Sequence, residues 1–545
     1  MKTTTYTGHI VDIREKRIFA GEIVVEKGRI AEIRPIESVA EDAPYYLPGL
    51  VDAHIHIESS LMLPVQFARV AVRHGVTAAI CDPHEITNVL GVEGIDFMVN
   101  NARNSRFGFY FGLPSCVPSS HLETAGARID AAQTRELIKR DDLWFLAEMM
   151  NFPGVLADDA GTWQKLAAAK EAHKPIDGHA PGVLGENLRK YIGAGVTTDH
   201  ECSSIEEARE KIAAGMKVLV REGSAARNFE ALYPIIGEHP AMTMLCSDDK
   251  HPDDLIQGHI DALVRRGMAH GLSVWDLLQA AALNPVEHYR IPAGMMREGD
   301  PATFIAVDNL HDFNVVRTVI KGHEVYNAEQ GLIDSELTLP YEHPAAPNNF
   351  KAQPITEDDI RCEITEDRAK IIKAFDGELF TATEIATAEG LHTDPSIQKI
   401  MVYNRYGNGR PQVAFIRGFD IRRGAIGATI AHDSHNIVVI GSNDRDMVCI
   451  ANALIEIKGG IGVCDGEAVD LLPLPIAGLM ADAPAEEIAE KWQRLSDKTR
   501  ALGCPFRAPF ISMAFMALPV IPELKLTDKG LVDVLKFDFT ELLIR

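Results

Sequence analysis

Two histidines follow an apolar run near the N-terminus of the chain, and they are spaced two residues apart. The segment Leu50–His56 reads LVDAHIH, which predicts a buried strand. Because side chains alternate across a strand, His54 and His56 point to the same side. Two imidazoles on one face at the end of a strand can bind one metal ion. A pair of this kind also occurs by chance, so the rest of the chain must supply further ligands.

Further metal-ligating side chains come singly at the ends of later apolar runs. Each alone has an ordinary alternative as a loop residue or a helix N-cap. Together with the first two histidines they make six ligands, which is too many for one tetrahedral zinc ion. The additional residues are Glu148, His179, His200 and Asp248.

Six ligands of this kind suit two divalent ions bridged by Glu148 and a water molecule. Two ions lying close together lower the pKa of a bound water, so that hydroxide exists at neutral pH. Asp248 stands where a general base takes the proton and passes it to a leaving group. Asp249 is the alternative for that role, because the register is ambiguous by one position.

The elements that must position these residues alternate between strands and helices over roughly residues 49–290. Repeated β-α units of this length predict a (β/α)8 barrel, a fold in which active sites lie at the C-terminal ends of the strands. The later strands are expected at 76–80, 108–113, 143–148, 175–179, 196–200, 217–220 and 242–247, and helices at 62–74, 159–173, 204–214 and 273–282.

The regions on either side of the barrel indicate two more domains. Short β-strands are expected in 1–48 and again in 290–340, so both flanks of the barrel (49–289) should build one small β-sandwich domain. A Pro- and Asn-rich stretch at 342–349 is typical of a linker. Beyond it, residues 350–545 have the mixed pattern of an α+β domain.

The amino-acid composition of the chain indicates which kinds of binding partner are disfavoured. The chain of 545 residues has a net charge of -24, which disfavours nonspecific binding to nucleic acid or to an anionic membrane. Its 8 cysteines are scattered, and no stretch has about 18 successive apolar residues, so we expect a reduced, cytoplasmic protein. A homo-oligomer, either a dimer or a tetramer, is expected.

These residues resemble the amidohydrolase superfamily and, within it, the bacterial adenine deaminase family. The run 48–56 is general to the superfamily, whereas Glu58-Ser59-Ser60 and the runs 82–91 and 224–228 are more specific. Many members of the superfamily bridge their metals with a carbamylated lysine on the fourth strand. Glu148 occupies that place here, as in the adenine deaminases. The resemblance covers the whole chain.

This resemblance implies the hydrolysis of adenine to hypoxanthine and ammonia, as in purine salvage. It implies two divalent ions, with Mn2+ as first choice and Fe2+ or Zn2+ as alternatives. Glu85 or His84 is then expected to protonate a ring nitrogen of the purine. The residues expected to bind the purine edge, or alternatively to begin a helix after the seventh strand, are Ser224, Arg227 and Asn228.

Two histidines of the C-terminal region leave their role open. His432 and His435 follow a strand-like run, and they either reach the barrel mouth of the same or a neighbouring subunit or form a cluster inside their own domain.

Other functions also stay open at this point. One is a different amidohydrolase that acts on a cyclic amide, an acetylated sugar or another 6-substituted purine. The lack of the fourth-strand lysine and the presence of His84-Glu85 argue against it. The other is a non-catalytic assembly protein, which the complete ligand set disfavours.

Overall fold

Eight parallel strands form a closed barrel in the middle of the chain, within the residues that the computed structural model describes (3–340, 345–407 and 409–545). Strands β5 to β9 pair in one run and β10 to β12 in another. Two backbone hydrogen bonds join the runs, from Thr197 N to Ile176 O at 3.0 Å and from Asp248 N to His54 O at 2.9 Å. The predicted (β/α)8 barrel is therefore confirmed.

The strands lie close to the predicted ranges. Strand β10 is the shortest, and Asp199 at its end accepts a hydrogen bond from Ala180 N of the loop that follows β9. The barrel strands are β5 (Leu50–Ile55), β6 (Val76–Cys81), β7 (Gly108–Leu113), β8 (Leu143–Met149), β9 (Ile176–Gly178), β10 (Thr198–Asp199), β11 (Lys217–Arg221) and β12 (Thr243–Cys246).

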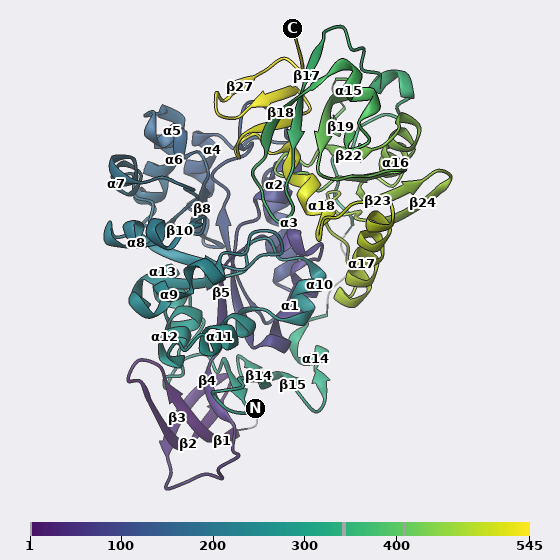
Figure 1. Cartoon of the computed structure of the whole chain (residues 1–545). Coiled ribbons are helices and arrows are strands. Elements are labelled where there is room, and N and C mark those ends of the chain that lie inside the picture. The colour runs from purple at the N-terminus through teal and green to yellow at the C-terminus, as the bar shows by residue number, and fades with distance from the viewer. Residues whose placement is uncertain (1–2, 341–344, 408) are drawn as a thin grey trace.

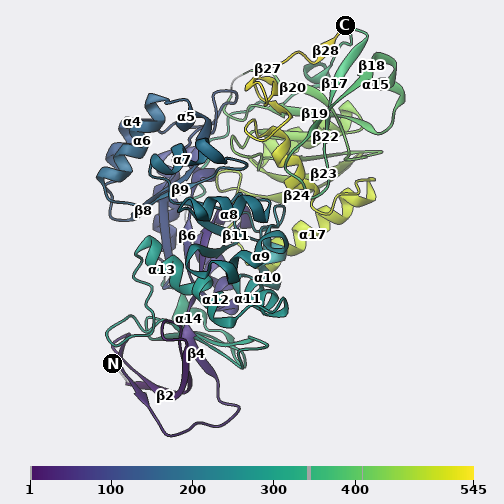
Figure 2. The same cartoon turned by 60° about the vertical axis from the view of Figure 1, so that its left-hand side comes forward.

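Helices cover the outside of these strands, as Figure 2 shows for α4 to α13. Polar N-caps begin two of the predicted helices, since Asp159 accepts from Thr162 N before α6 and Ser204 accepts from Glu207 N before α8. The helices of the barrel are α1 (Pro64–Ala71), α2 (His84–Leu90), α3 (Val92–Ala102), α4 (Ala131–Leu137), α5 (Phe152–Leu156), α6 (Ala160–Glu171), α7 (Gly185–Gly193), α8 (Ile205–Ala213), α9 (Phe229–Glu238), α10 (Pro252–Gln257), α11 (Ile260–Ala269), α12 (Val274–Leu278) and α13 (Asn284–Tyr289).

Strands from both flanks of the barrel pair in one sheet, in the order β16-β15-β14-β13-β4-β1-β2-β3. The first flank supplies β4, which pairs in parallel with β1 and antiparallel with β13 of the second flank. Figure 1 shows this sheet at the foot of the barrel. The strands are β1 (Thr4–Asp12), β2 (Arg17–Glu26), β3 (Arg29–Pro35), β4 (Tyr45–Pro48), β13 (Phe304–Val307), β14 (Val315–Ile320), β15 (His323–Asn327) and β16 (Gly331–Leu332).

An aromatic cluster explains why the two flanks meet. The Phe304 ring of β13 lies 5.1 Å from Tyr6 of β1 and 5.8 Å from Tyr46 of β4, measured between centroids. Edge-to-face rings of this kind add about 0.5–1.5 kcal/mol to the burial of their apolar area. The boundaries at residues 48 and 290 stay a prediction, and part of the expected linker, residues 342–344, lies outside the described residues.

The C-terminal region is a mixed α+β structure built on a long sheet in the order β18-β17-β20-β19-β22-β21-β23-β24, with β28 beside β17. Helix α16 (Asp444–Glu456) packs on β21 to β23. The other strands are β17 (Arg368–Lys373), β18 (Ala382–Thr387), β19 (Ile397–Tyr403), β20 (Gln412–Arg417), β21 (Ala425–Ala428), β22 (Ile437–Gly441), β23 (Gly460–Asp465), β24 (Ala468–Pro473), β25 (Leu524–Thr527), β26 (Gly530–Asp533), β27 (Asp538–Phe539) and β28 (Leu543–Ile544), and the other α-helices are α15 (Ala388–Thr393), α17 (Ala485–Ala501) and α18 (Pro509–Ala514).

This region packs directly on the barrel, to its upper right in Figure 1. Ala481 N donates to Leu61 O at 2.9 Å, just after the first barrel strand. Thr527 Oγ1 donates to Leu122 O at 2.7 Å, in the connection between β7 and β8. Among the described residues, no helix is long and apolar enough to cross a membrane.

A buried lysine joins the strand ends that carry two candidate ligands. The ammonium of Lys211 in α8 lies 3.0 Å from Asp199 and 2.7 Å from Glu207, with its side chain fully buried. Asp199 also accepts from Ala180 N at 2.7 Å and from Glu201 N at 3.2 Å. The loops after β9 and β10 therefore share one buried network.

We expect Lys211→Met to lower the free energy of unfolding by about 3–5 kcal/mol, because two carboxylates stay buried without their cation. Urea unfolding followed by circular dichroism measures the change. Lys139, whose surface ion pair with Glu136 is 3.0 Å long, offers a matched control. Lys139→Met should change the free energy by less than about 1 kcal/mol, and equal effects of the two variants would contradict the network.

Candidate metal centre

Four histidines and two carboxylates meet at the C-terminal ends of the barrel strands. His54 is the penultimate residue of β5 and His56 follows the strand, Glu148 lies in β8, and the other three follow β9, β10 and β12. Five of the six are buried and the sixth is half-buried. The structure thus brings together all six residues selected from the sequence: His54, His56, Glu148, His179, His200 and Asp248.

The carboxylate of Glu148 lies between two groups of histidines. Its Oε1 is 3.3 Å from His56 Nε2, while its Oε2 is 2.8 Å from His179 Nδ1 and 3.2 Å from His200 Nε2. Burial alone would raise the pKa of Glu148, but the neighbouring imidazoles, with His179 first, hold that pKa well below its usual value. The group is therefore a carboxylate that faces both sides of the cluster.

Asp248 faces the histidine pair of the first strand. Its Oδ1 lies 3.1 Å from His56 Nε2 and 3.5 Å from His54 Nε2, and these two nitrogens are 3.2 Å apart. Its Oδ2 lies 2.6 Å from Arg221 Nη1. Burial opposes ionisation of Asp248, but the Arg221 charge keeps its pKa well below the usual value.

Asp248 and Asp249 contact different partners, and which of them acts as the base stays a prediction. Asp249 accepts a hydrogen bond from Ser59 Oγ at 2.5 Å, whereas Asp248 makes the contacts with His54 and His56. The backbone of Asp248 has φ 54°, a left-handed conformation that is uncommon for residues other than glycine.

This donor set fits a divalent metal ion. Ligand atoms of His54, His56 and Asp248 lie within 4.8 Å of one another, and so do those of His54, Glu148 and His200. Imidazole nitrogen and carboxylate oxygen together suit manganese, iron and zinc. The Nδ1 of His56 faces the carbonyl oxygen of Asp82 at 3.1 Å, so a neutral ring has its proton on Nδ1 and leaves Nε2 free to bind a cation.

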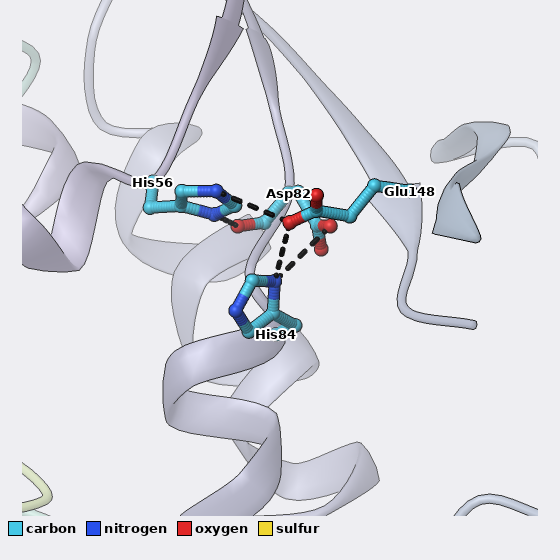
Figure 3. A group of neighbouring side chains, drawn as sticks. All are labelled: His56, Asp82, His84 and Glu148. Carbon is cyan, nitrogen blue, oxygen red and sulfur yellow. Dashed lines mark hydrogen bonds and ion pairs between the residues drawn. The ribbon is translucent and has the colours of Figure 1, made fainter. Parts of the chain in front are cut away.

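His84 joins the cluster from the helix that follows the second strand. Its Nδ1 lies 3.3 Å from Glu148 Oε1 and 3.2 Å from Asp82 Oδ2. Figure 3 shows His56 and His84 both directed at the Glu148 carboxylate. The ring of His56 is itself oriented by Asp82, whose carbonyl oxygen lies 3.1 Å from His56 Nδ1. Asp82 is not among the ligands predicted from the sequence, although it directly follows β6 as a strand-end residue.

Glu85 is contacted by the two histidines of the C-terminal region. His432 Nδ1 lies 2.6 Å from Glu85 Oε1, and His435 Nε2 contacts Glu85 Oε2. Both histidines therefore reach the barrel of their own chain, and the alternative of a cluster confined to their own domain is wrong.

A cavity lies against this cluster and has two kinds of wall. Its polar side includes Glu85, Glu201 and Arg221, the last two forming an ion pair of 2.9 Å. Its apolar side comes from the C-terminal region and was missed in the sequence, because no motif marks it. This apolar wall consists of Leu379, Phe515, Leu518 and Ile521.

The three residues expected at the purine edge do not line this cavity. Ser224 Oγ accepts from His251 N at 2.9 Å, Arg227 pairs with Asp254 at 2.8 Å, and Asn228 Nδ2 donates to Cys202 O at 2.6 Å. Asn228 is also the N-cap residue of α9, as the helix alternative required. Their role in substrate binding stays a prediction, and these contacts favour a structural role.

The side chains of the run Glu58-Ser59-Ser60 form hydrogen bonds with neighbouring parts of the barrel. Glu58 Oε1 accepts from Ile86 N at 3.2 Å near the start of α2, and burial raises the pKa of this carboxyl to about 7. Ser59 holds Asp249, and Ser60 Oγ donates to Ile57 O at 2.6 Å. The run thus fixes the backbone around two parts of the site.

Both the barrel and the C-terminal region are similar to known protein families. Residues 45–325 match the amidohydrolase family, and residues 378–538 match the adenine deaminase C-terminal domain. The chain is 48% identical to an adenine deaminase of Methanosarcina mazei, over 98% of this chain and 99% of that protein. The chain belongs to the adenine deaminase family. This membership confirms the resemblance read from the sequence.

Two further adenine deaminases are similar to this chain over nearly its full length. The adenine deaminase of Parabacteroides distasonis is 44% identical over 100% of this chain and 99% of its own length. That of Borreliella burgdorferi is 41% identical over 97% of this chain and 98% of its own length. The amidohydrolase match implies a divalent metal centre, and the cluster around Glu148 has the donors for it.

We expect a chelator to lower the melting temperature of the protein and Mn2+ to restore it. An ion that binds only the folded state stabilises it by about 2.7 kcal/mol at a hundred times its dissociation constant. Differential scanning calorimetry measures the shift. Glu148→Gln should lose most of it, whereas the surface variant Glu136→Gln should keep it. An undiminished shift in Glu148→Gln would contradict the site.

Proposed function

We propose that the protein hydrolyses adenine to hypoxanthine and ammonia with two divalent metal ions. The observation that carries this proposal is a six-residue ligand cluster that opens into a cavity with one apolar wall. Similarity over nearly the full chain to proteins named adenine deaminase supports the same substrate.

Two ions explain why the ligands form two groups. His54, His56 and Asp248 would hold one ion, and His179 and His200 the other, with Glu148 between them. Mn2+ is our first choice, and Fe2+ and Zn2+ suit the same donors. When bound, the ions lower the pKa of a water so that hydroxide is available at neutral pH.

Asp248 is the proposed general base. It takes the proton from the attacking water and delivers it to the departing amine. Arg221 binds its Oδ2 and keeps the group ionised, which leaves Oδ1 directed at His54 and His56. The base is therefore oriented by one fixed contact.

Glu85 or His84 is the proposed proton donor to a ring nitrogen, so that negative charge does not accumulate on the purine. Both line the same cavity, and their side chains lie 3.3 Å apart. The apolar wall faces them across the cavity and would cover one face of the flat ring.

We expect Asp248→Asn to lower kcat for adenine by about 10²–10⁴-fold, the range typical for loss of a positioned acid or base. Asp249→Asn should cost far less, because an asparagine oxygen can still accept the Ser59 hydroxyl. Hypoxanthine formation followed by absorbance gives both rates, and metal analysis shows whether each variant keeps its ions. A larger loss in Asp249→Asn would overturn the register.

We expect Leu518→Ala to raise the KM for adenine by about tenfold, since truncation of a buried apolar contact costs about 1–2 kcal/mol. Leu535 of the same region is 70% exposed and lies outside the cavity lining, so Leu535→Ala is the matched control. Steady-state kinetics on both variants provide the measurement. An unchanged KM in Leu518→Ala would exclude the apolar wall from the substrate site.

The alternative substrates are tested in the same assay. Ring opening of a cyclic amide, acetate release from an acetylated sugar or ammonia release from adenosine, with no ammonia from adenine, would replace the proposal. Absence of bound metal together with no turnover would favour the non-catalytic assembly protein.

The proposal also includes the domain boundaries, the cellular location and the oligomeric state of the protein. The chain divides into a β-domain (1–48 and 290–340), a catalytic barrel (49–289) and a C-terminal domain (350–545). The protein works in the cytoplasm, which the free state of all eight cysteines supports. It forms a dimer or tetramer, which sedimentation can measure.

A further inference from the structure

A loop of the C-terminal region, residues 432–436, extends to the barrel and contacts Glu85. One imidazole faces each carboxylate oxygen, with His432 at Oε1 and His435 at Oε2. All three side chains are buried. The nitrogen of His432 lies 2.6 Å from the oxygen of Glu85, so the two groups contact each other directly.

The same loop also faces the other candidate proton donor. Asp433 Oδ1 lies 3.9 Å from His84 Nε2, and that nitrogen is 3.3 Å from Glu85 Oε1. His432 and Asp433 both line the cavity beside the metal cluster. Three side chains of one loop are thus directed at the pair His84 and Glu85.

Several contacts fix the position of this loop. Tyr406 Oη donates to Ser434 O at 2.6 Å, and Asn436 Nδ2 donates to Thr124 O of the barrel at 3.0 Å. The ring of His432 stacks on Phe515 with centroids 4.6 Å apart and planes 5° apart. His435 has φ 55°, a conformation that residues other than glycine rarely adopt and that the surrounding contacts must hold.

The fully buried side chain of Arg405 hydrogen-bonds to the backbone of this loop. The Arg405 guanidinium donates to His435 O at 3.2 Å, to Ala477 O at 2.6 Å and to Asn348 Oδ1 at 2.9 Å. It also lies 4.9 Å from the centroid of the Phe350 ring. The carbonyl of His435 is therefore bound by a side chain that has no freedom to move toward solvent.

We infer that His432 and His435 are positioning residues, which hold the Glu85 carboxylate in the orientation that deamination requires, so that the C-terminal region completes the active site of the barrel. A carboxylate on a flexible side chain has several rotamers, and loss of the correct one costs rate rather than binding. The inference rests on the proposed function, in which Glu85 or His84 passes a proton to a ring nitrogen of the purine.

Steady-state kinetics on the full-length, Mn2+-loaded protein test the inference. His432→Ala and His435→Ala should each lower kcat for adenine by about 10–100-fold with KM within about threefold of wild type. In a Glu85→Gln background, each should lower kcat by less than about threefold further, because no carboxylate is left to orient. His435→Gln should recover part of the loss, since its amide can donate to Glu85.

His392→Ala is the matched control, because this histidine of the same region is exposed. It should leave kcat and KM unchanged. Losses that multiply in the Glu85→Gln background, a rise in KM alone, or a loss of bound metal in His432→Ala would each overturn the inference.

A second readout separates this inference from the proposed function. Thermal unfolding of the same single and double variants measures the coupling between Glu85 and His432 without any turnover. A wild-type protein that does not deaminate adenine contradicts the proposed function. A protein that deaminates adenine but shows no coupling between Glu85 and His432, in kcat or in unfolding, contradicts the inference.

Discussion

The meeting of four imidazoles with the carboxylates of Glu148 and Asp248 in a buried site is the constraint on which the rest of the structure depends. Charged groups removed from water cost several kcal/mol each unless partners surround them. Contacts with His56, His179 and His200 offset this cost for Glu148, and the contact with Arg221 offsets it for Asp248. A bound cation would complete the compensation, since the donors already face one another.

The barrel satisfies this constraint through its closure and its loops. Parallel strands direct all their C-terminal ends to one face, so ligands from β5, β8, β9, β10 and β12 meet there. Buried contacts then hold the loops in place. The ion pair between Lys211 and Asp199 links the loops that carry His179 and His200, and Tyr191 Oη donates to Met149 O beside Glu148. The precision of the site thus comes from contacts behind the ligands.

The C-terminal region gives the open end of the barrel its second wall. Its apolar residues cover the cavity, and its 432–436 loop contacts Glu85 and faces His84. Excluding water from such a cavity strengthens every electrostatic contact inside it. The region therefore lines the proposed reaction site as well as contributing to the fold.

The sequence by itself determined the barrel and the identity of the six-residue cluster, because periodicity and residue type at strand ends are local properties. It also showed that His432 and His435 could have a function, but it left their partner open. Only the tertiary structure paired them with Glu85, placed Arg221 on Asp248, and brought Leu518 to the cavity. It also showed Arg227 paired with Asp254 outside that cavity. These contacts join residues distant in the chain, and they depend on how whole elements pack, which no local spacing specifies.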